Sequence, residues 1–90
     1  MQEEFLRIIN HYGVGNQLKK LSEEVYEFQE AVLQDDGSEE ALEHIIEEYA
    51  DVLNVIEQFK YYIDFDDNKV NMWRVRKLNR TLKRMEDEDE

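Results

Sequence analysis

Two acidic segments with the same spacing are the residues in this chain best suited to chemistry. EEVYE at residues 23–27 is followed, twenty-four residues later, by EEYAD at residues 47–51, so both read E-E-x-x-[E/D]. With about 100° of rotation per helical residue, Glu24 and Glu48 each lie about 80–90° from the centre of the apolar stripe of their own segment. Both acidic segments therefore occupy the same flank of two consecutive amphipathic helices.

A tight turn at residues 35–38 makes these two helices antiparallel neighbours, so we expect four carboxylates to converge, those of Glu24, Glu27, Glu48 and Asp51. Like charges at that separation repel strongly unless a cation lies between them. Ligand sets made only of oxygen favour Mg²⁺ or Mn²⁺ over zinc. The alternative is an acidic helical hairpin whose glutamates are simply solvated, and the matched pair of motifs favours the metal site.

The composition predicts an all-α domain. The chain has 90 residues with no proline, three glycines and no cysteine, which favours long helices and excludes disulfides and thiolate metal sites. Apolar residues recur at helical spacing in four segments, and no period-two alternation indicates a strand. We expect helices at about 2–11, at about 16–34 with Asn16 as N-cap, from the Ser38 cap to about 63, and from about 69 onward. Residues 1–85 would form the domain, and residues 86–90 a disordered acidic tail.

The charge is high and unevenly distributed. The net charge of −12 argues against binding nucleic acid through its phosphates. Residues 69–84 hold seven of the eleven basic residues and no acid, whereas residues 1–68 hold eighteen acids and four bases. An acidic body with one basic helix suits a metal-and-phosphate site, although a solvated helix balancing an acidic neighbour would look the same. Without a signal peptide or a membrane-length apolar run, we expect a cytoplasmic protein with no membrane partner.

The acidic segments also carry a resemblance to a known family. EExxE at residues 23–27 with ExxD at residues 48–51 resembles the signature of the MazG-like nucleotide pyrophosphohydrolases, and especially their short phage and Firmicute members. The flanking HYG at 11–13, NQLxKL at 16–21, ADVL at 50–53 and KLNR at 77–80 resemble the same family. The resemblance implies a four-helix bundle assembled as a homodimer or a dimer of dimers. It also implies Mg²⁺-dependent cleavage of a nucleoside triphosphate, ribo or deoxy, to the monophosphate and pyrophosphate, with Mn²⁺ as a substitute.

The resemblance also implies roles for individual residues. Glu24, Glu27, Glu48 and Asp51 would hold the metal, and Glu23 would be a further ligand or, with Glu24, part of the catalytic machinery that activates water. The implied contacts to the triphosphate are Lys20, Lys77 and Arg80. Many members have a second arginine after the last of these, where this chain has Thr81, so the phosphate contacts differ here unless Arg76 or Arg84 substitutes.

Recognition of the base has the weakest signal in the sequence. His11, Tyr12, Gln17 and Trp73 could stack on a base or hydrogen-bond to it, and Asn54 and Gln58, which share a face with Asp51, could reach the sugar or the base. Tyr12 and Trp73 suit a core or a dimer interface better than a base site, and His11 also suits the end of a helix. Two other functions stay open. One is a non-catalytic acidic bundle that binds a partner, and the other is hydrolysis of a different phosphate ester, such as phosphoribosyl-ATP, by the same fold.

Overall fold

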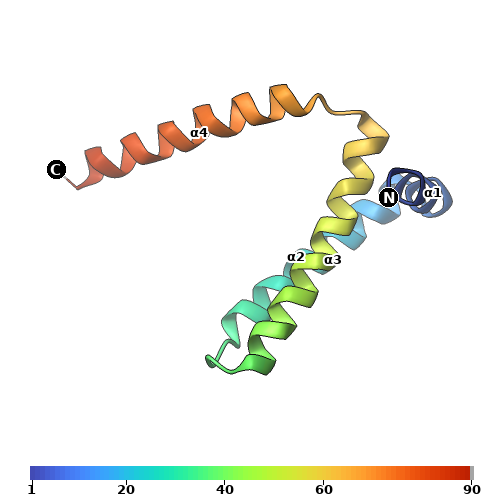
Figure 1. Cartoon of the computed structure of the whole chain (residues 1–90), viewed down its shortest axis with the longest axis horizontal. Helices are drawn as coiled ribbons and strands as arrows, with labels where there is room; N and C mark the ends of the chain where they lie inside the picture. Colours follow the sequence, from blue (N-terminus) through green and yellow to red (C-terminus); the bar gives the residue numbers. More distant parts are fainter. Residues whose placement is uncertain (90) are drawn as a thin grey trace.

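The computed structural model describes residues 1–89 as four helices (Figure 1). They are α1 (Gln2–Tyr12), α2 (Val14–Leu33), α3 (Glu39–Ile63) and α4 (Asp67–Glu88). No strand occurs within residues 1–89, so the predicted all-α class and the number of helices are confirmed. None of these helices is long and apolar enough to span a bilayer.

The break between α1 and α2 is shorter than the sequence indicated. Gly13 alone separates the two helices, with φ 92° and ψ 153°, a backbone conformation that strains any residue with a Cβ. The prediction that Asn16 is the N-cap of α2 is wrong, because α2 already begins at Val14. The Asn16 side chain instead donates a hydrogen bond back to the Tyr12 carbonyl at 2.7 Å, which ties the start of α2 to the end of α1.

The turn between α2 and α3 is held by side chains that bond to the backbone. The Gly37 N–H donates to Asp35 Oδ1 at 3.0 Å, and the Ser38 N–H donates to Asp36 Oδ1 at 2.9 Å. Hydrogen bonds from Ser38 lower the pKa of the Asp36 carboxyl. The predicted cap of α3 is confirmed, since Ser38 Oγ accepts from the Ala41 N–H at 3.1 Å. This turn makes α2 and α3 an antiparallel pair.

The core lies where α1 packs on the α2–α3 pair. The buried apolar side chains there are Phe5 and Ile9 of α1 and Val55 of α3, and Ala31 of α2 is buried further along the pair, near the turn. Phe5 also stacks on the Tyr61 ring, with the ring centroids 6.2 Å apart. Four buried apolar side chains make a small core even for a short chain.

Within the described residues, α4 packs against none of the other three helices and projects away from them (Figure 1). Its first turn is joined to the end of α3 by an ion pair between Lys60 Nζ and Asp67 Oδ1 at 3.4 Å. The radius of gyration is 16.6 Å, against about 12 Å for a compact chain of this length. One chain therefore closes a three-helix unit and leaves the fourth helix of the predicted bundle without a partner.

The exposed surface is correspondingly large. The chain exposes 7529 Å², whereas a compact monomer of its mass exposes about 5,600 Å². Much of the excess is apolar, and on α4 it includes Val75, Leu78, Leu82 and Met85, each about half exposed.

The acidic C-terminal segment is partly described. α4 continues through Glu88, so residues 86–88 form its last turn, and Glu90 lies outside the described residues. Disorder of residues 86–90 stays a prediction.

Removing the Ser38 cap should destabilise the fold measurably. Ser38→Ala leaves the Ala41 N–H without its acceptor, and we expect the free energy of unfolding to fall by about 1 kcal/mol. Urea unfolding followed by circular dichroism measures the change. Ser22→Ala is the matched control, because the Ser22 hydroxyl only returns to the Leu18 carbonyl of its own helix at 3.4 Å. Equal losses in both variants would contradict a capping role.

Candidate metal centre

The buried line of α2 that faces α3 is mostly polar. Its three buried residues are Gln17, Glu24 and Ala31, spaced seven residues apart, which places them on one face two turns from each other. Seven-residue spacing on a packed helix normally selects apolar side chains. The α2–α3 seam instead holds an amide and a carboxylate, and the candidate site is built around that carboxylate.

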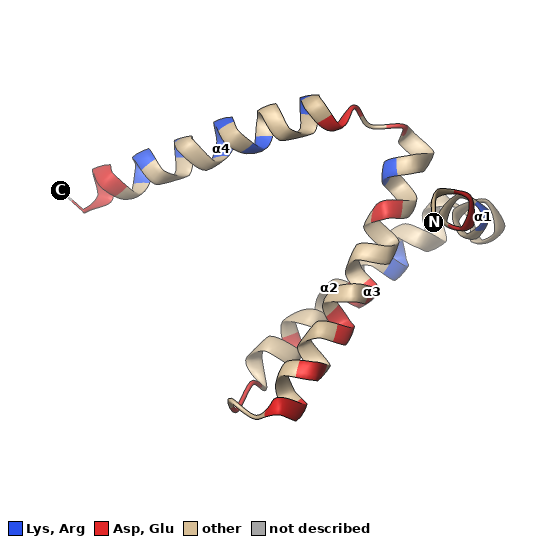
Figure 2. Cartoon of the chain, viewed as in Figure 1, with Lys and Arg blue, Asp and Glu red and all other residues tan. Residues whose placement is uncertain are grey.

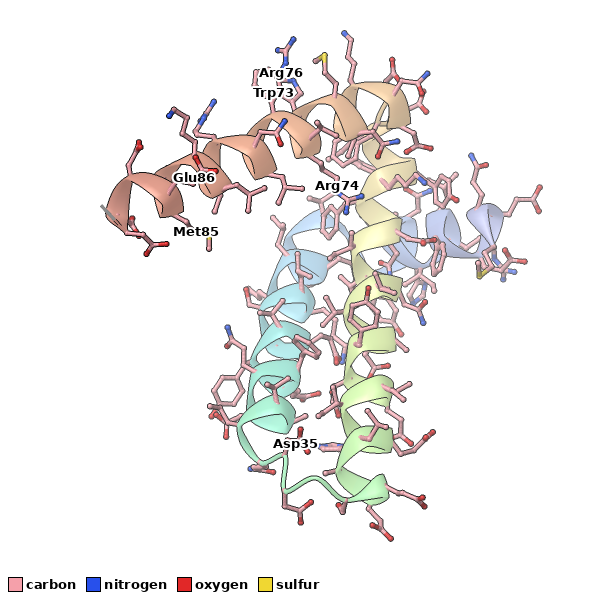
Figure 3. All side chains as sticks on the ribbon, turned by 60° about the vertical axis from the view of Figure 1, so that its left-hand side comes forward. Asp35, Trp73, Arg74, Arg76, Met85 and Glu86 are labelled. Atoms are coloured by element: carbon pink, nitrogen blue, oxygen red, sulfur yellow. The ribbon has the colours of Figure 1, made fainter. Side chains whose placement is uncertain are left out.

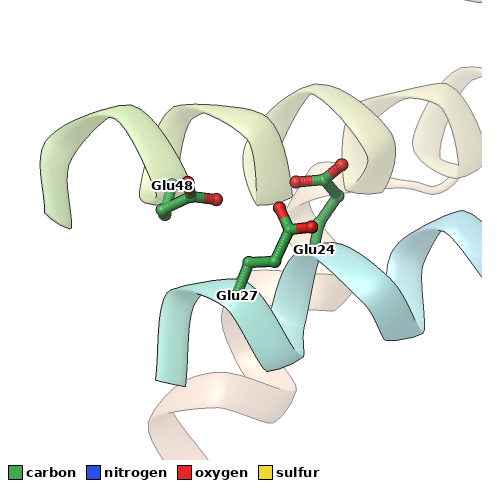
Figure 4. A group of neighbouring side chains, drawn as sticks. All are labelled: Glu24, Glu27 and Glu48. Atoms are coloured by element: carbon green, nitrogen blue, oxygen red, sulfur yellow. The ribbon is translucent and has the colours of Figure 1, made fainter. Parts of the chain in front are cut away.

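Three carboxylates meet at this seam, those of Glu24 and Glu27 from α2 and Glu48 from α3 (Figure 4). One oxygen from each lies within 4.8 Å of the others. Glu24 is buried with 5% of its surface exposed, Glu48 is half-buried and Glu27 is exposed. The structure thus brings together three of the four carboxylates expected to converge.

Lys20 neutralises the most buried of these carboxylates. Its Nζ lies 2.9 Å from Glu24 Oε1, one helical turn away on α2. The hydrogen bond and the charge of Glu24 raise the pKa of Lys20 above its ordinary value. The residue expected to contact phosphate therefore lies at the carboxylate cluster and pairs with it.

Two carboxylate oxygens of the cluster are buried without any hydrogen-bond donor. They are Oε2 of Glu24 and Oε2 of Glu48. The other oxygen of Glu48 faces the Nδ1 atom of His44 at 3.9 Å, which is too long for a hydrogen bond. His44 was not predicted as a site residue, although its place four residues before Glu48 on one helix face would have indicated the contact.

The negative charges of the neighbouring carboxylates affect the pKa of Glu27. The charge of Glu24 raises the pKa of the Glu27 carboxyl, and partial desolvation and the charge of Glu48 raise it further. A carboxyl whose pKa is raised by its neighbours disfavours the folded state while it is ionised. The three carboxylates are therefore mutually destabilising unless a cation binds among them.

The donor set fits a hard divalent cation. All three side chains offer oxygen, and two of the oxygens are buried with nothing to bond to. Mg²⁺ and Mn²⁺ suit such ligands better than softer metals do.

Asp51 and Glu23 lie beside the cluster but are not part of it. Gln17 and Gln58 bond across the seam, and Glu24 lies seven residues after Gln17 while Asp51 lies seven before Gln58. Asp51 is therefore level with Glu24 in the antiparallel pair, but its side chain is exposed. The Glu23 side chain is also exposed and lines a neighbouring cleft.

The structure does not bring Lys77 and Arg80 to the carboxylates of their own chain. Both are exposed residues of α4, the basic helix, whereas the acidic residues gather on the α2–α3 pair (Figure 2). Trp73 lies on α4 too, beside the Arg76 guanidinium at 5.4 Å from its ring centre. Figure 3 shows these two side chains on one side of α4, with Arg74 and Met85 on the other.

The remaining residues considered for base recognition lie on three helices, and Tyr12, Gln17 and Gln58 among them line one cleft. Gln17 is buried and donates a hydrogen bond to Gln58 at 2.8 Å. His11 is exposed in the last turn of α1, with its ring edge-on to the Tyr12 ring. Asn54 is exposed on α3.

Removing one negative charge from the cluster should stabilise the metal-free protein and weaken its response to metal. Glu27→Gln relieves the repulsion that raises the pKa of this carboxyl, so we expect a higher melting temperature than wild type in chelator at pH 7. The difference should shrink as the pH falls, because wild-type Glu27 then becomes neutral too. In Mg²⁺, wild type should gain more stability than the variant. Differential scanning fluorimetry in both conditions measures this, with Glu30→Gln as control, and identical behaviour of the two variants would argue against a metal site.

The comparison with known families covers most of the chain. Residues 13–84 match the model of the MazG nucleotide pyrophosphohydrolase domain. No curated protein and no solved structure gives a significant match. The matched range contains both acidic segments, Lys20 and the basic part of α4. The chain therefore belongs to the MazG nucleotide pyrophosphohydrolase family.

Proposed function

We propose that this protein is a Mg²⁺-dependent nucleoside triphosphate pyrophosphohydrolase, which cleaves between the α and β phosphates and releases pyrophosphate. The observation that carries the proposal is the cluster of Glu24, Glu27 and Glu48, with two buried oxygens that lack any donor, in a chain of this family. A buried carboxylate oxygen without a partner is costly, and a bound cation removes that cost.

The chain's residues would divide the chemistry between them. Glu24, Glu27 and Glu48 would hold Mg²⁺, with Asp51 reaching the same ion by a change of rotamer. When bound, Mg²⁺ would neutralise the phosphates and lower the pKa of a bound water. Glu23 is exposed and next to the cluster, which suits a general base. It would take a proton from the water molecule whose oxygen attacks the α phosphorus. The bond to the bridging oxygen then breaks, and the leaving pyrophosphate keeps that oxygen.

The positive charge for the leaving pyrophosphate would come from α4 of a second copy. In one chain α4 is basic and unpartnered, while the α2–α3 pair is acidic and exposes a row of apolar side chains. The chain exposes about 1,900 Å² more than a compact monomer, so two chains have enough surface for a stable dimer, whose interface buries 2,000 Å² or more in total. An exchanged α4 would place Lys77 and Arg80 over the partner's carboxylates, where opposite charges attract.

The proposed activity is tested directly by pyrophosphate release from a panel of NTPs and dNTPs in Mg²⁺. Glu48→Ala should abolish turnover, because the carboxylate is needed to position the metal. Arg80→Ala should keep metal binding and lose about ten- to a hundredfold in kcat/KM, as expected for one charge-assisted contact to phosphate. Lys69→Ala, at the start of α4, is the control for a basic residue of the same helix.

Each outcome of that assay decides something. Wild type that binds Mg²⁺ but releases no pyrophosphate from any nucleotide would overturn the proposal in favour of a non-catalytic binding role. Orthophosphate as the product, or turnover of phosphoribosyl-ATP alone, would indicate a different phosphate ester. If Glu48→Ala is inactive while Arg80→Ala equals wild type, α4 does not contact the phosphates.

The protein should be at least a dimer in solution. Light scattering at micromolar concentration should return a mass of twice the 10.9 kDa chain or more. Leu78→Lys combined with Leu82→Lys should dissociate the assembly, because both side chains would be charged inside the interface. Asn79→Lys, on the polar side of α4, should leave the mass unchanged. A wild-type mass of 10.9 kDa would refute the assembly and with it the exchange of α4.

A further inference from the structure

The hydrogen-bonded amides of Gln17 and Gln58 form a second polar feature of the α2–α3 seam. Gln17 Nε2 donates to Gln58 Oε1 at 2.8 Å, and the two residues are only 6% and 4% exposed. This bond leaves Gln17 Oε1 as an acceptor and Gln58 Nε2 as a donor, and neither bonds to another described residue. Among the described residues, the side-chain atoms that are both fully buried and without a hydrogen-bond partner are one oxygen of Glu24 and one of Glu48, and neither amide is among them. The two spare amide atoms therefore reach solvent.

These two amides line a cleft of about 490 Å³ between α1, α2 and α3. Small-molecule sites commonly have this size. Ile8, Tyr12 and Val55 give the cleft apolar walls beside the amide pair. Further along α2, Lys20 and Glu23 line it, and Lys20 is the partner of Glu24. The cleft thus runs from the amide pair to the edge of the carboxylate cluster.

We propose that the Gln17–Gln58 pair binds the hydrogen-bonding edge of a nucleobase, in the same nucleotide whose phosphates meet the carboxylate cluster. This inference rests on the proposed function and adds the site that recognises the base. Gln17 and Glu24 lie seven residues apart on one helix, about 10 Å along its axis. One ligand with an uncharged ring at one end and a phosphate chain at the other can span that distance.

The chemistry of the cleft matches a base. Every nucleobase has flat apolar faces and an edge with hydrogen-bond donors and acceptors side by side. Apolar contact with Ile8 and Val55, and stacking on the half-exposed Tyr12 ring, suit the faces. The acceptor of Gln17 and the donor of Gln58 suit the edge. The spare amide atoms would then gain partners, which favours a ligand that carries such an edge.

We expect the Gln17–Gln58 pair to require a ring with a hydrogen-bonding edge, without selecting one particular base. Turning both amides by 180° exchanges donor and acceptor but keeps the bond between Gln17 and Gln58, since each amide offers both kinds of atom. Either order of donor and acceptor on the base can therefore be matched. An apolar edge cannot, because it would leave both amides unpaired.

Calorimetric titration with two hydrolysis-resistant α,β-methylene triphosphates in Mg²⁺ tests this. One carries adenine, and the other carries indole, which has a similar shape but lacks an edge with adjacent donor and acceptor. Wild type should bind the adenine compound about ten- to a hundredfold more tightly. Gln17→Met combined with Gln58→Met should bring the two affinities within about threefold, because adenine loses its hydrogen bonds while indole no longer leaves two amides unpaired. Replacing both partners preserves the packing better than replacing one, and Gln29→Met on the exposed side of α2 should keep the wild-type ratio.

The outcomes separate this inference from the proposed function. Wild type that releases pyrophosphate but binds both compounds equally would overturn the base site alone, as would a double variant that loses affinity for both compounds in equal proportion. Wild type that binds neither compound and releases no pyrophosphate would overturn both. If the double variant does not fold, the side-chain amide signals of wild-type Gln17 and Gln58 in NMR spectra decide. The Gln58 N–H signal should move downfield with adenine, as expected for a new hydrogen bond, and not with indole. Equal downfield shifts with both compounds would overturn the proposal.

Discussion

The burial of the Glu24 carboxylate between α2 and α3 is the constraint on which the rest of this structure depends. Taking an ionised group out of water costs several kcal/mol, even after the protein relaxes around it. Lys20 offsets part of that cost at one oxygen, and the other oxygen has no partner. The described residues include only four buried apolar side chains, so the free energy of unfolding is too small to absorb such a cost easily. An apolar residue would stabilise this position more, so the carboxylate costs stability unless a ligand binds it.

The same constraint explains why charge is segregated along the chain. Carboxylates that converge on one seam gain from a cation and from nearby positive side chains, but a permanent partner for each would exclude the cation. Lys20 is flexible and half exposed, so it can leave Glu24 when a metal arrives. The other basic residues are held on α4, away from the cluster in a single chain. Assembly of two chains would then bring opposite charges together without filling the metal site.

Features set by local chemistry could be predicted from the sequence. Ser38 caps α3 because its hydroxyl meets a free N–H three residues on, and Glu24 and Glu48 meet because two equal motifs flank one tight turn. The start of α2 was misplaced because Asn16 has the chemistry of a cap, whereas Gly13 alone supplies the positive φ that ends α1. The separation of α4 from the other helices could not be predicted. An apolar stripe shows which face of a helix packs against another element, but it does not show whether that element belongs to the same chain.

The hydrogen bond between Gln17 and Gln58 could not be predicted from the sequence for a related reason. The apolar periodicity describes each helix by itself, whereas this bond joins two helices. Its consequence is mechanical. Gln17 and Glu24 stand on one face of one uninterrupted helix, so no loop intervenes between the amide pair and the carboxylate cluster. Inserting one residue between them would rotate one end of the cleft by about 100° relative to the other. Sites on rigid helices are held more closely than sites on loops, so the spacing between ring and phosphates is fixed by α2 itself, and a ligand must match it.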